Sequence, residues 1–246
     1  MRRFALLLTI LLLTLSPLSA KEYQVLVYHG ANPPYYYLQQ GKETGLFVDI
    51  FSELAQRTGH QFTFMPLSVA RGSRFFDQGK VDIEPGINPL WRQGAEVPGI
   101  YSISYAYSRE VILGRANSCP VNATPEDFYG ALVGKVRGYH YGDFDAHLGT
   151  NRIVAYENVS EKELLAQLAH QRLDYIMIGD VTADFYIAHQ EAYRDFEECY
   201  EISRLPVNMR LQPKLTQLQQ TMNKALRQMV NDGTVKAIYS KYRLSH

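Results

Sequence analysis

The chain has 246 residues, of which 46% are hydrophobic and 20% are charged, a composition typical of a soluble globular protein with one large domain or two lobes. Lys plus Arg and Asp plus Glu each number 25, so the formal net charge at pH 7 is zero. A nucleic-acid-binding surface requires a basic excess, and we therefore expect no nucleic-acid partner.

The first twenty residues have the form of a secretory signal peptide. Arg2 and Arg3 supply a positive start, residues 6–15 form an apolar run, and small residues precede a predicted cleavage after Ala20. A membrane anchor is the alternative, but the run is shorter than the roughly 20 residues that a spanning helix needs. No cysteine follows the run for lipid attachment. We therefore expect an exported, periplasmic protein.

The chain has two cysteines, Cys119 and Cys199, and an oxidising compartment favours a structural disulfide between them. Their separation is far from the C-x-x-C spacing of a redox motif, and two lone thiols make a poor metal site. Two separate buried thiols are the alternative.

A helix organises the first part of the chain. Between Gly45 and Gly59, apolar residues recur at helical spacing, and Gly59 suits a left-handed C-terminal cap. Short strands are predicted before the helix, at 23–28, and after it, at 61–65. Strand, helix and strand in this order favour a parallel sheet with a right-handed crossover. The loop at 30–37 then falls at the ligand-binding edge of that sheet.

Two further segments complete the first half. A short helix closed by Gly79 and a strand at 81–83 lead into a turn-rich loop at 84–89, which we expect at the same edge of the sheet. Extended chain is predicted over 101–107 and 111–113.

A second α/β unit follows a turn-like boundary at 114–122. Its predicted elements are a helix start at Thr124-Pro125, a strand at 132–136, a glycine-rich loop at 137–143, a helix opened by the Ser160–Glu163 capping box, a strand at 175–178, and helices over 215–229 and 235–242. No linker is long enough to separate independent domains. The second half thus repeats the order of the first.

The sequence contains no recognisable catalytic motif. The patterns H-E-x-x-H and G-x-S-x-G, the Walker loop and the pattern G-x-G-x-x-G are all absent, and the seven histidines lack metal-ligand spacing. Among them, His140 alone lies near a predicted strand end, as a pocket wall or a surface residue. We therefore expect neither a metal nor a cofactor.

Polar and aromatic side chains lie near predicted strand ends in both halves. The planar fork of Arg92 could clamp a ligand carboxylate, although a surface ion pair with Glu96 is the plainer interpretation. Asp180 directly follows a buried strand and could bind a ligand ammonium or cap the helix after it. Arg71 is a further candidate with the same surface alternative. The tyrosines that could stack on a ligand are Tyr35, Tyr36, Tyr37, Tyr139 and Tyr141.

In order and spacing, these features resemble the bacterial periplasmic solute-binding proteins of family 3, the receptors that deliver polar amino acids to ABC importers. The resemblance covers residues 21–246. The matching segments are Pro33-Pro34-Tyr35, residues 45–55, Gln78–Asp82, Arg92, Gly134–Gly142, Leu173–Tyr175 followed by Asp180, and Asn231–Thr234 before Lys241-Tyr242.

The resemblance implies an α/β fold of the periplasmic binding protein type. This fold is a two-lobe clamp in which each lobe has a mostly parallel sheet flanked by helices, with two hinge crossings between the lobes. Lobe 1 would comprise 21–113 and 207–246, and lobe 2 would comprise 114–206. Ligand binding would close the clamp. In the family the matching arginine holds the ligand α-carboxylate and the matching aspartate holds the α-ammonium, roles that carry over to Arg92 and Asp180.

Three departures from the family pattern bear on the ligand. Phe47 stands where an acid is usual, and Asn88 lies among residues that replace the usual hydroxyl groups before the arginine. Asp143 follows Tyr141-Gly142 where a Ser or Thr often meets the carboxylate, which Asp143 would repel. These departures argue against an ordinary α-amino acid. The ligand-binding residues that we expect are Tyr35, Arg71, Asn88, Arg92, Tyr141 and Asp180.

We expect a monomeric, non-enzymatic periplasmic receptor for a small polar solute, an amino acid or a related compound, with an ABC permease in the inner membrane as its partner. Two alternatives stay open. One is a sensory protein that docks on a membrane receptor. The other is an enzyme similar to cyclohexadienyl dehydratase, which needs a general acid that the sequence does not single out.

Overall fold

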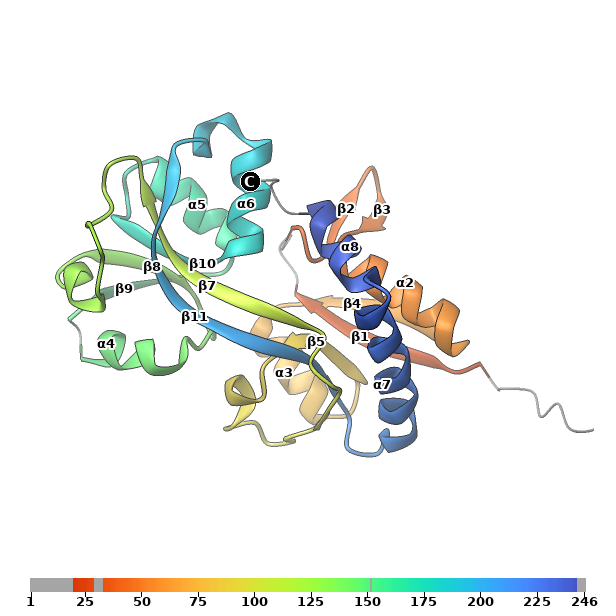
Figure 1. The fold of residues 1–246 in the computed structure, drawn as a ribbon. Helices are drawn as coiled ribbons and strands as arrows, with labels where there is room; N and C mark the ends of the chain where they lie inside the picture. The colour runs from red at the N-terminus through yellow and green to blue at the C-terminus, as the bar shows by residue number, and fades with distance from the viewer. Residues whose placement is uncertain (1–19, 29–32, 151, 243–246) are drawn as a thin grey trace, which may run out of the picture.

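The computed structural model describes residues 20–28, 33–150 and 152–242, which form two lobes joined by a pair of long strands (Figure 1). Apart from Ala20, the predicted signal peptide lies outside the described residues, and so does the 29–32 part of the first loop. Within these ranges, no helix combines the length and apolar character that crossing a membrane requires.

The sheet of the first lobe is parallel at its centre. Strand β1 (Glu22–Tyr28) pairs in parallel with β4 (Gln61–Leu67) and with β5 (Ile83–Ile87). Helix α2 (Leu46–Thr58) lies between β1 and β4 in the chain, as predicted, and Gly59 ends it in the left-handed conformation with φ 70°. The predicted strand–helix–strand unit is confirmed.

Helices cover both faces of this sheet. The remaining elements of the lobe are the hairpin of β2 (Tyr37–Gln39) and β3 (Lys42–Thr44), α3 (Val69–Asp77), the 3-10 helix η1 (Pro89–Arg92), β6 (Ile100–Tyr101), α7 (Thr216–Asn231) and α8 (Thr234–Tyr242). Val25 packs with α2, α7 and α8, whereas the next residue, Leu26, packs with Phe76 of α3 on the opposite face. This alternation follows from the two-residue repeat of a strand.

Strand β5 begins at Ile83, two residues later than predicted, and extends to Ile87. The prediction of a loop over 84–89 is therefore wrong for 84–87. The turn-forming pair Pro85-Gly86 is tolerated in the strand because the pairing of β5 with β11 is irregular there, and Gly86 has a positive φ of 70°.

Two long antiparallel strands pass from one lobe to the other. Strand β7 (Ala106–Arg115) pairs with β11 (Phe196–Leu211) over nearly its whole length. Their pairing joins both sheets into one mixed sheet of order β4-β1-β5-β11-β7-β10-β8-β9. No strand is predicted from the sequence at 196–211, because charged and half-exposed residues interrupt its apolar pattern.

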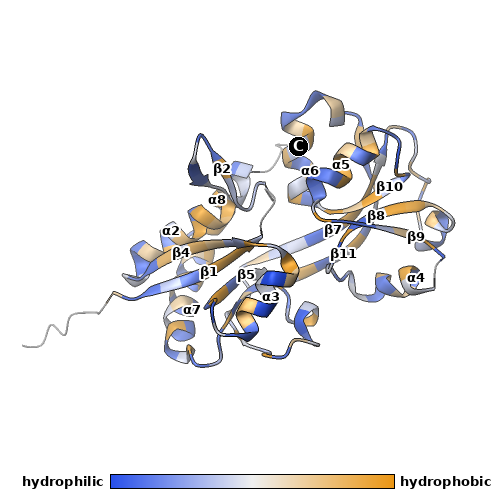
Figure 2. Cartoon of the chain, turned by 180° about the vertical axis from the view of Figure 1, so that it is seen from behind, coloured by the Kyte–Doolittle hydropathy of each residue, from blue (hydrophilic) through white to orange (hydrophobic). Residues whose placement is uncertain are grey.

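The second lobe repeats the arrangement of parallel strands and covering helices. Its elements are the 3-10 helix η2 (Pro125–Phe128), β8 (Leu132–Val136), η3 (Gly142–Phe144), α4 (Asp145–Gly149), β9 (Val154–Asn158), α5 (Glu161–Ala169), β10 (Tyr175–Gly179), α6 (Asp180–His189) and η4 (Glu191–Tyr193). Strand β8 pairs in parallel with β9 and β10, and β10 pairs antiparallel with β7. The core of this lobe includes Val111 and Leu113, at the end of the segment assigned to lobe 1 from the sequence. Hydrophobic residues concentrate on the strands and on the inner sides of the helices in both lobes (Figure 2).

The disulfide favoured by the sequence is present in the second lobe. Cys119, in the turn after β7, is bonded to Cys199 of β11 with an S–S distance of 2.01 Å. The bond ties the two long strands together at one end.

A buried cluster of charges lies in the first lobe. Glu84 of β5 and Arg210 of β11 are each about 1% exposed, and Arg210 Nη1 lies 2.9 Å from Glu84 Oε2. Arg92 of η1 approaches the other oxygen of the same carboxylate, with Nη2 at 2.6 Å from Oε1. The guanidinium of Arg210 also stacks on Phe76, 3.9 Å from the ring centre. The carboxylate therefore joins β5, β11 and η1.

Replacing Cys119 and Cys199 together by Ser is expected to lower the free energy of unfolding by about 4 kcal/mol, because the bond closes a loop between residues 80 apart in the chain. Urea unfolding followed by circular dichroism measures the change. The wild-type protein unfolded in a reductant should resemble the double variant. If the oxidised, reduced and substituted proteins unfold at the same urea concentration, the expectation is wrong.

Glu84→Gln is expected to lower the free energy of unfolding by roughly 3–5 kcal/mol, because it leaves two buried guanidinium groups without a counter-charge. Glu96→Gln removes an exposed carboxylate from the same lobe and should change stability by less than about 0.5 kcal/mol. Equal urea midpoints for the two variants would show that the buried ion pairs contribute no stability.

Candidate functional site

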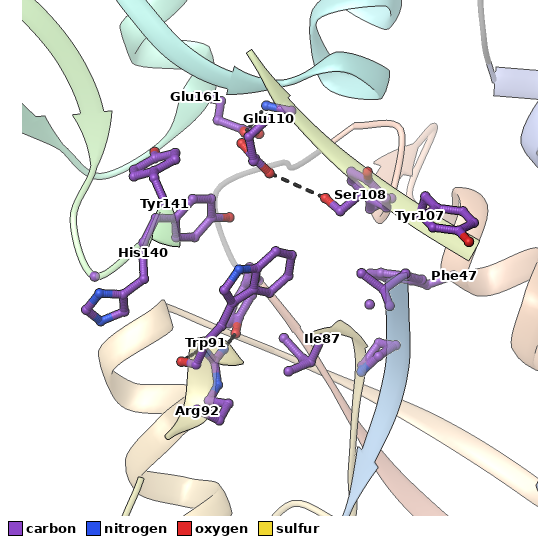
Figure 3. A pocket seen from close by; sticks show the side chains of 18 of the residues that line it. Phe47, Ile87, Trp91, Arg92, Tyr107, Ser108, Glu110, His140, Tyr141 and Glu161 are labelled. Atoms are coloured by element: carbon purple, nitrogen blue, oxygen red, sulfur yellow. Dashed lines mark hydrogen bonds between the residues drawn. The ribbon is translucent and has the colours of Figure 1, made fainter. Parts of the chain in front are cut away.

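A cavity lies between the two lobes, beside the crossing strand β7 (Figure 3). The residues that line it are Tyr28, Tyr35, Phe47, Pro85, Gly86, Ile87, Trp91, Arg92, Val207 and Tyr239 from lobe 1, Tyr107, Ser108 and Glu110 from β7, and Gly138, Tyr139, His140, Tyr141, Glu161 and Gly179 from lobe 2. Both lobes and the crossing strand therefore contribute walls to one cavity.

The 3-10 helix η1 brings Trp91 and Arg92 to the cavity. Asn88 caps this helix, because its Oδ1 accepts a hydrogen bond from the Leu90 N–H at 2.9 Å. Its Nδ2 donates to the carbonyl of Pro206 at 2.7 Å, which fixes η1 against β11. Asn88 is buried and does not line the cavity. Its polar groups thus hold the helix in place.

Arg92 lines the cavity, but internal partners already occupy its guanidinium. The Nη2 atom donates to Glu84 at 2.6 Å and to the Tyr28 hydroxyl at 2.7 Å. Its Nε donates to Glu84 at 3.3 Å, and its Nη1 donates to the Trp91 carbonyl at 3.0 Å. Four of the five N–H groups of the guanidinium are thus used. The ion pair is formed with Glu84 and not with Glu96, and no two parallel N–H groups are left to clamp a ligand carboxylate.

The charge state of Glu84 follows from these contacts. Burial alone would raise the pKa of the Glu84 carboxyl, but Arg92, the Tyr28 hydroxyl and Arg210 hold that pKa below its usual range. The carboxylate is therefore ionised at neutral pH, and it neutralises part of the positive charge at this end of the cavity.

Two carboxyl groups line the opposite side of the cavity and point toward one another (Figure 3). Glu110 of β7 accepts a hydrogen bond from the Ser108 hydroxyl at 3.4 Å. Glu161, in the first turn of α5, accepts one from the Gly179 N–H at 3.2 Å. The second oxygen of each carboxyl, Oε2, is buried and has no hydrogen-bond partner among the described residues. Within the described part of the chain, these two oxygens therefore lack both a protein partner and contact with solvent.

Burial raises the pKa of the Glu161 carboxyl to about 7, against the opposing effects of the Gly179 N–H and the nearby Thr182 side chain. The pKa of Glu110 lies well above its ordinary value, first because of burial and then because of the negative charges of Glu161 and Asp180. The pair therefore retains a proton at neutral pH when no cation is nearby.

Aromatic rings form much of the remaining wall. Tyr35 packs against Phe47 with 5.2 Å between ring centres, and Tyr28 of lobe 1 approaches Tyr139 of lobe 2 at 6.4 Å. The hydroxyl of Tyr141 is buried and, within the described ranges, has no hydrogen-bond partner. Burial raises its pKa well above the ordinary value.

Of the five tyrosines considered in the sequence, Tyr35, Tyr139 and Tyr141 line the cavity. The other two lie nearby with different contacts. Tyr36 is buried and donates to Glu43 at 2.7 Å. Tyr37 packs against Phe185 of α6, with 5.6 Å between ring centres.

The structure places the remaining expected residues as follows. Arg71 is exposed on α3, and its guanidinium lies 5.0 Å from the ring centre of Phe75, outside the cavity lining. Asp180 is buried at the start of α6, and its Oδ1 accepts a hydrogen bond from the Val181 N–H at 2.7 Å. It does not line the cavity, although its charge contributes to the raised pKa of Glu110.

His140 forms part of the cavity wall, one of the two places expected for it, and its Nδ1 lies 3.5 Å from Asp145 Oδ2. In the part of the chain that the structure describes, no group of three or more His, Cys, Asp or Glu side chains is arranged to hold a metal ion.

Sequence reasoning missed the two carboxyl groups. Glu110 precedes the apolar run 111–113, and strand alternation puts it on the same face as Ser108, which was a usable signal for an inward carboxylate. Glu161 was interpreted only as a first-turn residue of a capped helix, and nothing in its local sequence indicates that it faces Glu110.

Among curated proteins, none matches the chain. Solved structures do match. An ancestral arginine-binding protein bound to arginine aligns with a TM-score of 0.77 and 20% identity over 90% of this chain and 97% of its own. A histidine kinase sensor domain with similarity to periplasmic binding proteins aligns with a TM-score of 0.76 and 20% identity over 89% of this chain and 95% of its own.

A third solved structure is an ancestral amino acid-binding protein described as a precursor of cyclohexadienyl dehydratase. It aligns with a TM-score of 0.73 and 18% identity over 91% of this chain and 95% of its own. At these identities the likeness establishes the two-lobe fold. The sequence model of the bacterial extracellular solute-binding proteins, family 3, matches residues 25–245, and the chain therefore belongs to that family.

Proposed function

We propose that this protein is an exported receptor that captures a small polar solute, an amino acid or a related compound, and delivers it to an ABC permease in the inner membrane. One observation supports this function above the others. The cavity is lined by lobe 1, lobe 2 and the crossing strand β7 together. A solute bound there contacts both lobes at once, so it favours the closed arrangement over the open one.

Contacts at the edges of the cleft are consistent with such closure. Tyr28 faces Tyr139 across the cleft with 6.4 Å between ring centres. Tyr37 of β2 packs against Phe185 of α6 at 5.6 Å. Because these pairs join residues of different lobes, they add stability to the closed state alone.

An enzyme similar to cyclohexadienyl dehydratase is the second candidate, and one observation favours it. The Glu161 carboxyl, with its pKa near 7, could serve as the general acid that the sequence did not single out. Prephenate and arogenate each carry two carboxylates, however, one more than an ordinary amino acid, and the cavity presents two acidic side chains and an arginine already bound to Glu84. The acidic side chains therefore favour a solute with fewer carboxylates, and with it the receptor over this enzyme. Formation of phenylpyruvate or phenylalanine from these substrates would contradict that preference.

Trp91→Ala is expected to weaken binding of the solute by about 30-fold, a loss of about 2 kcal/mol, because the Trp91 ring forms part of the cavity wall (Figure 3). The solute is first found by a thermal-shift screen of the purified mature protein. A solute at 100 times its dissociation constant adds about 2.7 kcal/mol of stability. Calorimetry then compares the variants.

The matched control is Tyr156→Ala, which removes an exposed aromatic ring from β9, away from the cavity. Its affinity should equal that of the wild type, and small-angle X-ray scattering should show a smaller radius of gyration when the solute is bound. Equal affinities for both variants, or no compaction on binding, would contradict a clamp centred on this cavity.

Cells that lack this protein are expected to lose high-affinity uptake of the solute and to regain it when the gene is restored, because the proposed partner is a permease. The measurement is uptake of the labelled solute at low concentration. Unchanged uptake, together with a lost transcriptional response to the solute, would favour the sensory role in place of transport.

A further inference from the structure

We propose that the cavity binds a small organic cation, an alkylammonium group without a carboxylate, through the side chains of Glu110 and Glu161. This inference rests on the proposed receptor function and narrows its ligand. Four properties of the cavity support the inference: its acidic groups without a cationic partner, its buried oxygens without a hydrogen-bond partner, its aromatic walls, and the hydrogen bonds that already occupy Arg92.

In the described part of the chain, the titratable groups that line the cavity without a partner of opposite charge are acidic. Arg92 is neutralised by Glu84 at 2.6 Å, and His140 is close to Asp145, with 3.5 Å between Nδ1 and Oδ2. The two carboxyl groups on the opposite side have no cationic partner among the described residues that line the cavity. A cationic ligand is the group that compensates them.

Two buried carboxyl oxygens of residues that line the cavity have no hydrogen-bond partner within the described residues: Glu110 Oε2 and Glu161 Oε2. Glu161 is 5% exposed, so water reaches its carboxyl poorly. Buried polar atoms in native proteins are nearly always paired, and unpaired ones are unfavourable. A primary ammonium has three N–H donors and can serve both acceptors.

The aromatic walls suit the rest of such a ligand. Rings from both lobes and from β7 line the same cavity as the carboxyl groups: Tyr35, Phe47, Trp91, Tyr107 and Tyr139. Ring faces attract organic cations, and they also pack against the methylene groups next to a charged nitrogen. The described residues offer no metal-type arrangement of ligands, which favours an organic cation over a metal ion.

The state of Arg92 argues against a ligand carboxylate. With Glu84, Tyr28 and the Trp91 carbonyl as partners, it retains a single N–H for a ligand. A zwitterionic amino acid would therefore bring a carboxylate into a cavity with two acids and no free guanidinium fork. An amine without a carboxylate avoids this repulsion.

Binding of an amine is expected to depend on pH. The charge of Glu161 acts on titratable groups of several elements: Glu110 of β7, Tyr186 of α6, Tyr35 of lobe 1, and Tyr139 and Tyr141 of the loop after β8. Asp180 of α6 acts in turn on Glu110. None of them is cationic, so the ligand-free Glu161 carboxyl holds its proton up to about pH 7, and the pKa of the Glu110 carboxyl is also raised well above its ordinary value. A bound cation requires their ionised forms and releases these protons.

The association constant for an amine should therefore rise with pH, by up to about tenfold per pH unit for each proton released, until the carboxyls are ionised. The folding stability of the ligand-free protein has the opposite dependence on pH. Between the ordinary glutamate pKa of 4.5 and the Glu161 pKa of about 7, its stability falls as pH rises, because the unfolded chain ionises first. Glu161→Gln should remove the contribution of Glu161 to this fall in stability between pH 4.5 and about 7.

The test is isothermal titration calorimetry at pH 6 and pH 8 in two buffers of different ionisation enthalpy. The probes are ethanolamine and putrescine as amines, choline as a cation without N–H donors on nitrogen, L-glutamine as a zwitterion and L-glutamate as an anion. We expect an amine to bind at least tenfold more tightly than choline or glutamine, with a buffer-dependent heat that reports proton release.

Glu110→Gln and Glu161→Gln are each expected to weaken amine binding at least 100-fold. The matched control is Glu163→Gln, which changes an exposed glutamate on the same helix as Glu161 and should leave the affinity unchanged. Melting curves of the ligand-free variants at pH 8, at or above the wild-type midpoint, show that both are folded.

If no amine binds, or if amines bind without proton release, the inference is wrong. If glutamine binds more tightly than every amine and the lobes close, the receptor function stands and the cationic ligand is rejected. If no compound in the probe set or in the thermal-shift screen binds, the receptor function fails as well.

Discussion

One buried carboxylate, that of Glu84, joins the elements of lobe 1 that lie beside the cavity. Glu84 of β5 lies between Arg210 of β11 and Arg92 of η1, and all three side chains are largely withdrawn from water. A buried charge without its partner is strongly unfavourable, so separating these three groups would destabilise the lobe. Three elements meet at this carboxylate: strand β5, the crossing strand β11 and the 3-10 helix η1, which carries Trp91. The carboxylate therefore fixes η1, and with it Trp91 and Arg92, on the lobe 1 side of the cavity.

The same carboxylate changes the electrostatic character of the cleft. The resemblance to the family implies that Arg92 holds a ligand carboxylate, but its guanidinium is directed to the internal acid Glu84. With that positive charge neutralised, the acidic pair Glu110 and Glu161 has no cationic partner among the described residues that line the cavity.

Local patterns predicted the fold well and the site only in part. The apolar repeat from Leu46 to Leu54 and the glycine after the helix specify α2 almost to the residue, because both signals are local. Strand β11 escaped prediction, because its two halves serve different cores and its exposed middle breaks the alternation. Whether Arg92 faces a ligand or Glu84 depends on a partner eight residues away in the sequence, across a turn whose path the sequence does not reveal. Glu110 and Glu161 are further apart still, and they meet because both lie beside Gly179 of β10, which pairs with Glu110 and donates to Glu161.

The disulfide limits how the clamp can move. Cys119 and Cys199 fasten the lobe 2 end of the ribbon formed by β7 and β11, and the ladder from Ala106 to Arg115 pairs the rest, with two register shifts on the β11 side. Two strands fixed at one end and paired along their length resist sliding past one another, because every ladder hydrogen bond would have to break together. If the lobes open, as the proposed function requires, torsion of the ribbon is the motion that this pairing leaves available. The stiffness of the ribbon then sets how much of the binding free energy closure consumes.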